Sequence, residues 1–107
     1  MGTLDEREKD FERKYEHDQE LIFKVKARRN HLLGLWAAGH LGLSGDAAEA
    51  YAKDVVNTEL EPHGEEKVVQ KVAADLAVKG VAIDAVRVGL EMERCTSEAR
   101  RQLGVPG

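Results

Sequence analysis

The side chains of this sequence that could do chemistry are few and are spread along the chain. Its four histidines are His17, His31, His40 and His63. No two of them have the four-residue spacing of a helical metal site. The single cysteine, Cys95, has no second cysteine with which to form a disulfide or a paired metal site. No Ser-His-Asp or Cys-His set is identifiable from local spacing. We therefore expect neither an enzyme nor a metal site, and no cofactor.

One pair of glycines imitates a phosphate-binding loop. Gly34 and Gly39 have the G-x-x-x-x-G spacing of such a loop. The next two residues are His and Leu, whereas a phosphate loop requires Lys and then Ser or Thr. We interpret Gly34 as a site where a neighbouring helix packs closely, since glycine inside a helix costs about 1 kcal/mol relative to alanine. Whether the chain binds a nucleotide stays open at this point.

The charge of the chain argues against nucleic acid as a partner. The 20 acidic residues outnumber the 16 basic ones, and the net charge is −4, whereas nucleic-acid-binding domains are usually basic. The basic cluster of the sequence is Lys24, Lys26, Arg28 and Arg29. The stretch from residue 44 to residue 66 contains seven acidic residues and one lysine. We interpret both regions as solvent-facing surfaces and expect no nucleic acid partner.

The distribution of apolar residues argues against a membrane protein. No run approaches the roughly 18 apolar residues of a transmembrane helix. The N-terminus is densely charged and lacks the apolar region of a secretory signal. A lone cysteine suits a reducing compartment. With 107 residues, we expect a single cytoplasmic domain with no direct membrane insertion.

The elements that must position these residues are four amphipathic helices. Apolar residues recur at three-to-four spacing across four regions. The first covers about 19–41, the second is capped by Ser44 or Asp46 and ends near residue 58, the third covers 65–80, and the last ends at 103. Four β-branched residues between 81 and 88 leave a strand open at the start of the last region, but its length favours a helix. The predicted fold class is all-α: a small four-helix bundle over residues 20–107, preceded by a mobile, latent-helical segment over residues 1–19.

The same spacing predicts which residues form the core. In the first long helix, the apolar stripe includes Ile22, Val25, Leu32 and Leu33 and leads to Trp36. We expect Trp36 to be a buried anchor of the core. In the last helix, one face carries Ala85, Val88, Met92, Cys95, Ala99 and Leu103, and Ile83, Val86 and Leu90 widen it. We expect Cys95 on this face to be structural.

The first 20 residues differ in composition from the rest of the chain. Of the nineteen residues from 2 to 20, twelve are charged, and the large apolar ones are Leu4, Phe11 and Tyr15. Thr3 and Glu6 have the spacing of a capping box, and acid-before-base pairs recur four residues apart, which favours a helix. So little apolar surface cannot offset an ordering cost of about 1–2 kcal/mol per residue. The segment is therefore expected to be a helix that awaits a partner.

Three sequence strings identify a family resemblance. They are FERKYEHD at 11–18, ARRNHLLGLWAA at 27–38 and the pair Tyr51-Ala52, with VVQKVAADL further on. Together they resemble the alphaproteobacterial zeta subunit, a small inhibitor protein of the F-type ATP synthase. The similarity covers nearly the whole chain and is densest from residue 5 to residue 56.

The resemblance implies a fold, a partner and a mechanism. The fold would be a four-helix bundle with a mobile N-terminal segment, and the free protein would be a monomer. Residues 1–19 would become a helix wedged at a catalytic α/β interface of the ATP synthase head, against the rotor, and would block ATP hydrolysis. The residues expected to contact the α, β and rotor subunits are Leu4, Arg7, Phe11, Lys14, Tyr15 and His17. The protein would be bacterial and cytoplasmic, and peripheral to the inner membrane through the ATP synthase.

A second class of function is compatible with the same residues. The chain could be a helical binding module that docks on another complex through its N-terminal helix without inhibiting an ATPase. Both hypotheses use the same front segment, so they differ in consequence rather than in the residues involved.

Overall fold

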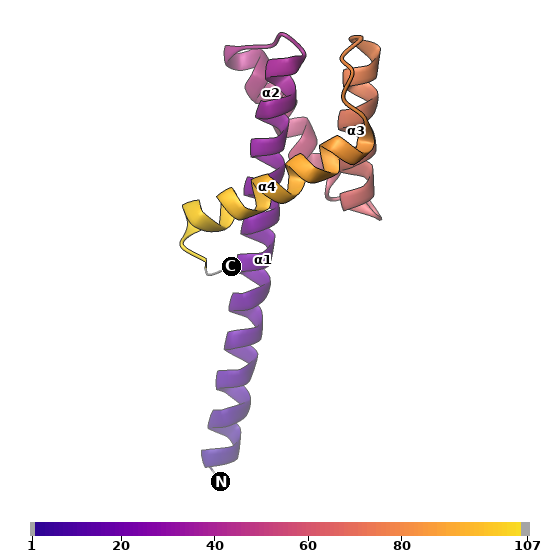
Figure 1. Cartoon of the computed structure of the whole chain (residues 1–107). Helices are drawn as coiled ribbons and strands as arrows, with labels where there is room; N and C mark the ends of the chain where they lie inside the picture. The colour runs from indigo at the N-terminus through magenta and orange to yellow at the C-terminus, as the bar shows by residue number, and fades with distance from the viewer. Residues whose placement is uncertain (1, 106–107) are drawn as a thin grey trace.

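A computed structural model describes the backbone of residues 2–105 and the side chains of residues 17–105. It contains four α-helices: α1 (Gly2–His40), α2 (Gly45–Thr58), α3 (Gly64–Val78) and α4 (Ala85–Leu103). Among the described residues there is no strand, so the β-branched start of the last element is not one. The all-α, four-helix prediction is confirmed (Figure 1).

Helix α1 is the central element of the molecule. Its C-terminal half packs most extensively against α2 and α4, and α3 packs mainly against α4 and α2. Its N-terminal half continues as the same helix beyond the other three (Figure 1). The buried core at the packed end consists of Leu33, Ala37, Leu41, Val55, Val68, Val72, Leu76, Val88, Met92 and Cys95. The bundle is therefore built around one half of a helix whose other half projects from it.

A close helix contact lies between α1 and α2 at Gly34. A Cβ atom added to Gly34 would lie 2.6 Å from the Cα of Ala52 and 3.3 Å from a methyl carbon of Val55. Real Cβ atoms do not approach backbone carbons so closely, so the contact requires glycine on one helix and a small residue on the other. The interpretation of Gly34 as a packing glycine is confirmed.

The corner between α2 and α3 is tight and has special backbone geometry. His63 caps α3 from the left-handed region, with φ 57°. A side chain at the next residue, Gly64, would collide with the backbone carbonyl of Glu59. This corner therefore places Glu59 and the first turn of α3 close together, beside α1.

Helix α4 has a recognisable capping residue at each end. The carboxylate of Asp84 accepts a hydrogen bond from the backbone N–H of Arg87 at 2.9 Å. Gly104 ends the helix in the left-handed conformation, with φ 68°. Residues 81–84, which the sequence left between strand and helix, precede the first turn of α4.

The predicted face of α4 is correct at its centre and too wide at its edges. Val88 and Cys95 are buried as expected, but Val86, Leu90 and Ala85 are exposed. Val86 and Leu90 each lie two residues from Val88, which is about 200° around a helix, so they point away from the core.

The predicted apolar stripe of α1 also needs two corrections. Trp36 is partly buried at the rim, where its ring meets the His40 ring edge-on with centroids 4.9 Å apart. The fully buried anchor is Leu33, because it faces the centre of the bundle between α2 and α4. Ile22 is exposed, because it lies where α1 leaves the bundle.

Candidate partner-binding helix

The six residues expected to bind the partner all belong to α1. The side chains that lie outside the described residues are those of Leu4, Arg7, Phe11, Lys14 and Tyr15. The sixth, His17, is exposed, as are the three residues that follow it. The structure thus gives the backbone of these positions as one helix, and their contacts with a partner stay a prediction.

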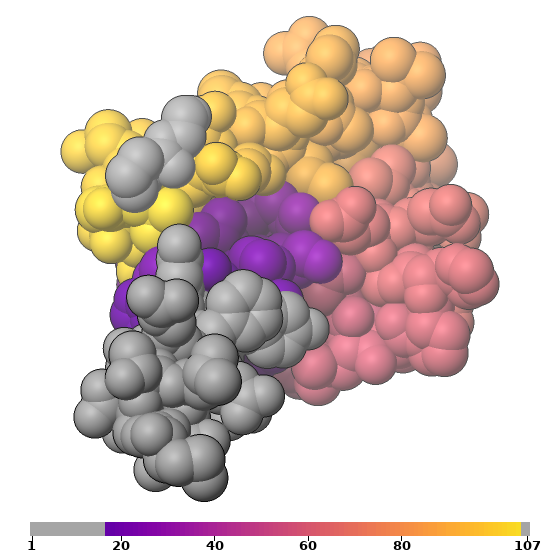
Figure 2. Space-filling model, turned by 90° about the horizontal axis from the view of Figure 1, so that it is seen from below, coloured from indigo at the N-terminus to yellow at the C-terminus, as the bar shows by residue number. Residues whose placement is uncertain are grey.

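Packing on α1 begins between residues 21 and 25. Leu21 is half-buried and Val25 is buried, and from there the helix is covered by its neighbours. Figure 2 views this end of the bundle, where α1 emerges between the end of α4 and the α2–α3 side. A partner that binds the helix before residue 20 does not have to displace any of the described core.

Arg29 ties α1 to the α2–α3 corner through a buried network. Arg29 is only 5% exposed. Its guanidinium donates hydrogen bonds to the carboxylates of Glu59 and Glu65, and the bond to Glu65 is 3.1 Å long. Its Nε also donates to the side-chain oxygen of Asn30 at 3.0 Å. Three acceptors satisfy the buried charge, as a buried guanidinium requires. The network holds the α2–α3 corner against α1, a few residues C-terminal to the point where α1 emerges from the bundle.

This network corrects the interpretation of the charged regions. The basic cluster was expected to be a solvated face, but Arg29 is among the most buried charged residues described. The acidic stretch was also expected to face solvent, yet the Glu59 side chain is only 16% exposed. Each charge is buried because the other is within bonding distance. The sequence signal was available: Arg29 interrupts an apolar stripe four residues after Val25 and three before Leu32.

A second polar link joins α1 to α4. The guanidinium of Arg28 donates to the side-chain oxygen of Gln102 at 3.0 Å. Gln102 in turn donates to Glu98 at 3.1 Å, and Arg101 also bonds Glu98. The bonds from Arg101, followed by those from Gln102, lower the pKa of Glu98 to about 2. Helix α1 is therefore held by polar links on both sides of its exit from the bundle.

The pair Tyr51-Ala52, one of the strings that carry the resemblance, has a packing role in this structure. The Tyr51 hydroxyl donates to the Asp75 carboxylate at 2.8 Å, which joins α2 to α3. Lys71 bonds the same oxygen at 3.1 Å and lies 5.1 Å from the centre of the Tyr51 ring. Burial, followed by the bond to Asp75, raises the pKa of Tyr51. Ala52 provides the close contact with Gly34.

Cys95 lies in the core, as expected. It is completely buried on α4, among the residues that pack against α1 and α3. Burial, with the nearby Glu91 charge as a smaller cause, raises the pKa of its thiol to about 11. Because the thiolate is the reactive form, this environment makes Cys95 unreactive near neutral pH.

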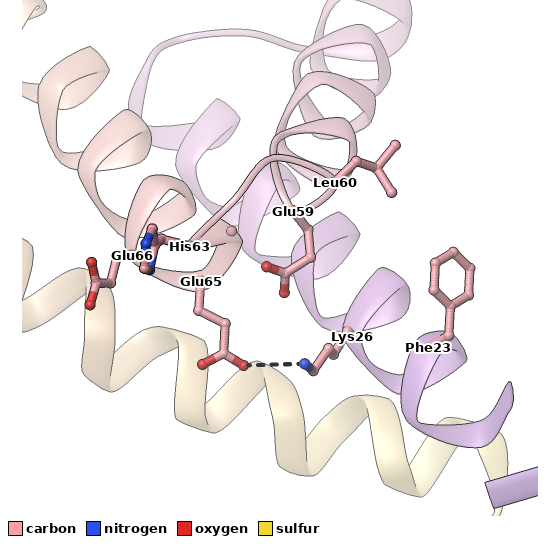
Figure 3. A pocket seen from close by; sticks show the side chains of 8 residues that line it. Phe23, Lys26, Glu59, Leu60, His63, Glu65 and Glu66 are labelled. Carbon is pink, nitrogen blue, oxygen red and sulfur yellow. Dashed lines mark ion pairs between the residues drawn. The ribbon is translucent and has the colours of Figure 1, made fainter. Parts of the chain in front are cut away.

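One of the hollows of the surface lies at the α2–α3 corner, beside α1. The one drawn in Figure 3 has a volume of about 620 Å³ and is lined by charged residues together with Phe23 and Leu60. Its ion pair joins Lys26 to Glu65, with the two atoms 3.9 Å apart. Phe23 and Leu60 project to one side of this charged cluster (Figure 3). Phe23 is 63% exposed and Leu60 is 71% exposed. The sequence analysis assigned neither of them, since Phe23 lies off the apolar stripe of α1 and Leu60 follows the end of α2.

Two kinds of feature are absent from the part of the chain that the structure describes. No group of three His, Cys, Asp or Glu residues in that part of the chain is placed to hold a metal ion. No helix there is long and apolar enough to cross a membrane.

Comparisons with known proteins agree with the fold and with the resemblance. The family model described as ATPase inhibitor subunit zeta matches residues 1–102. Among solved structures, the chain is similar to a protein solved by NMR in solution, at 44% sequence identity and a TM-score of 0.67. That similarity covers 76% of this chain and 92% of the other. The curated proteins contain no match. Because the family model spans nearly the whole sequence, this chain belongs to the ATPase inhibitor subunit zeta family.

Proposed function

We propose that residues 1–19 of this chain bind at a catalytic α/β interface of the F-type ATP synthase head, against the rotor, and block ATP hydrolysis. Family membership supports the role of ATPase inhibitor. The observation that carries the mechanism is the continuity of α1, which runs from Gly2 to His40 with its second half held in the bundle. A helix clamped at one end is suited to act as a wedge.

The anchorage of α1 supports a mechanical role for its first half. The links from Arg29 to the α2–α3 corner and from Arg28 to α4 fix the direction in which the helix leaves the bundle. A wedge has to resist the force of a turning rotor, and a loose tether would transmit none of that resistance. On this proposal, the bundle over residues 20–107 anchors the inhibitory segment over residues 1–19 and sets its direction.

The composition of the segment supports reversible binding. Twelve charges in nineteen residues leave Leu4, Phe11 and Tyr15 as the large apolar contacts. Because large apolar side chains supply most of the affinity of an interface, so few of them limit the affinity, which is useful in a regulator that must be released. On this proposal the protein is a regulator rather than a catalyst, and it lies in the cytoplasm, at the inner membrane only through the ATP synthase.

The test is an ATPase assay on the cognate enzyme with the intact chain and with a chain that lacks residues 1–18. We expect the intact chain to inhibit hydrolysis and the shortened chain to have no effect. The shortened chain should keep nearly the same thermal midpoint, because every described core residue lies after position 24. Equal inhibition by the two chains would show that the front segment is not the inhibitory element.

A parallel binding measurement separates the proposal from the alternative of a docking module. Both hypotheses predict that the intact chain co-purifies with the catalytic head. A chain that binds the head tightly while hydrolysis continues at its full rate would support the docking module and contradict inhibition.

A further inference from the structure

We propose that the face of α1 between α2 and α4 is a docking surface for an acidic amphipathic helix of a partner protein. Its centre is an open hollow of about 640 Å³, the Lys24–Arg28 hollow. The hollow is lined by Lys24, Arg28 and His31 together with four apolar side chains. The surface includes none of residues 1–19, so its partner need not be the one that they bind.

The fold divides the basic cluster of α1 between two sides of the helix. Lys26 and Arg29 meet carboxylates of the α2–α3 corner. Lys24, Arg28 and His31 fall within about 60° of one another around a helix, and the other two positions fall on the opposite side. These three side chains line the hollow, and no acidic side chain of the described residues lines it with them. The acidic corner therefore neutralises only one half of the cluster.

The two strongest cations of the hollow have no anionic partner in the described part of the chain. Lys24 and Arg28 are both exposed, and the ion pairs there include neither of them. Arg28 donates a hydrogen bond to a neutral acceptor, the side-chain oxygen of Gln102, at 3.0 Å. Glu20 lies one turn before Lys24 on α1 but forms no ion pair with it. A partner carboxylate does not have to displace an internal one to reach these two cations.

The hollow follows α1 for about two helical turns. Phe23 and His31 are its limits on this helix, and eight residues correspond to about 12 Å. Val56 of α2 and Leu103 of α4 border it, so three helices meet there. At one end, His31 bonds Glu49 of α2 at 2.9 Å. A surface of this length, with apolar side chains from three helices, matches two turns of an amphipathic helix.

The charges of the chain specify the chemistry of that helix. Apolar side chains beside unpaired cations select a partner with an apolar face and carboxylates next to it. The net charge of the whole chain is −4, so its overall field repels acidic partners. Attraction of an acidic helix therefore depends on the local cations, Lys24 and Arg28.

The chain offers a matched control for these two cations. Lys53 on α2 and Lys79 after α3 are also exposed, and neither lines the hollow. The ion pairs of the described residues include neither of them. Their replacement removes the same two positive charges from the chain. An effect of net charge alone would appear equally at these positions.

The experiment compares two full-length double variants with the unmodified chain. One is Lys24→Gln with Arg28→Gln, and the control is Lys53→Gln with Lys79→Gln. The probe is a fluorescent synthetic peptide with leucine at three-to-four spacing and glutamate elsewhere, titrated by anisotropy at low salt. We expect the Lys24/Arg28 variant to bind it about threefold to tenfold more weakly, and the control to match the unmodified chain. All three proteins should have similar thermal midpoints.

Two further measurements locate the binding and test the apolar contribution. In NMR spectra of the unmodified chain, the peptide should shift the amide signals of residues 23–31 on α1. A second peptide, with alanine in place of every leucine, should bind more weakly than the first. Amide shifts confined to other parts of the chain would contradict the proposed position.

The remaining outcomes overturn the inference. The first is a peptide affinity for the unmodified chain weaker than about 1 mM. The second is an equal loss of affinity in the two variants, which would reduce the effect to net charge. Binding to phosphatidylglycerol vesicles in place of the peptide, lost only in the Lys24/Arg28 variant, would assign the hollow to an anionic lipid surface. Self-association of the unmodified chain that the same variant abolishes would assign it to a second copy.

Discussion

Replacing Arg29 by methionine should destabilise the bundle by about 2–4 kcal/mol. Arg29 is 5% exposed, and its removal leaves the Glu59 carboxylate without its cation while only 16% of that side chain is exposed. Breaking a fully buried ion pair costs roughly 3–5 kcal/mol, and the partial exposure of Glu59 lowers this range. Glu65 contributes little, because 57% of its side chain is exposed. Methionine retains the packing of the aliphatic stem, so the change isolates the charge.

The assay is urea unfolding of a double-mutant cycle formed by Arg29→Met and Glu59→Gln. Because the two side chains bond directly, we expect their effects to be coupled by about 1–3 kcal/mol. For a domain of this size, the thermal midpoint of the Arg29→Met variant should fall by roughly 10–25 °C. The unfolding transition is followed by far-ultraviolet circular dichroism, which reports on all four helices.

A neighbouring pair supplies the control and the refuting result. Lys26 lies 3.9 Å from Glu65, and the two side chains are 44% and 57% exposed, so Lys26→Met should cost less than about 1 kcal/mol. If Arg29→Met costs no more than Lys26→Met, the Arg29 network does not hold the corner to α1. Strict additivity of Arg29→Met and Glu59→Gln would equally contradict the direct interaction.

Three other predictions concern packing, reactivity and the front segment. Gly34→Ala should destabilise the bundle by about 1–3 kcal/mol in denaturant unfolding despite the better helix propensity of alanine, because its methyl meets the α2 backbone; an unchanged midpoint would show that α2 can move away. Cys95→Ser should leave ATPase inhibition unchanged, and the native thiol should react with a maleimide only at the rate of unfolding; fast labelling of the folded protein would contradict its burial. Phe11→Ala with Tyr15→Ala should weaken binding to the ATP synthase head roughly a hundredfold, measured by titration of inhibition, and a change below threefold would remove these residues from the interface.

The long helices could be predicted from the sequence because each of them carries its own evidence. The stripes that end at Val55, Leu76 and Ala99 have period near 3.6, and a helix buries such a stripe wherever its neighbours lie. The interpretation of Gly34 also succeeded, because a glycine inside a helix calls for a local reason that packing supplies. Both inferences depend on residues close together in the chain.

The errors concern which side of a helix is covered. Ile22, Val86 and Leu90 were assigned to the core on their type and spacing, and all three are exposed. Arg29 and Glu59 were assigned to solvent on their charge, and both are largely buried. In each case the deciding fact is the position of another helix, which the spacing within one helix does not contain.

By itself, the sequence determined the all-α class, the approximate limits of the packed helices and the place of Cys95 in the core. It also determined the family, through the strings FERKYEHD and ARRNHLLGLWAA. The tertiary structure decided that Arg29 meets Glu59 across thirty positions of the chain and that Phe23 and Leu60, both exposed, line one hollow. The physical reason is the separation along the chain of the residues on which each feature depends. Helix formation depends on neighbours three or four residues apart, whereas a buried ion pair and a surface hollow both depend on where distant segments come to lie.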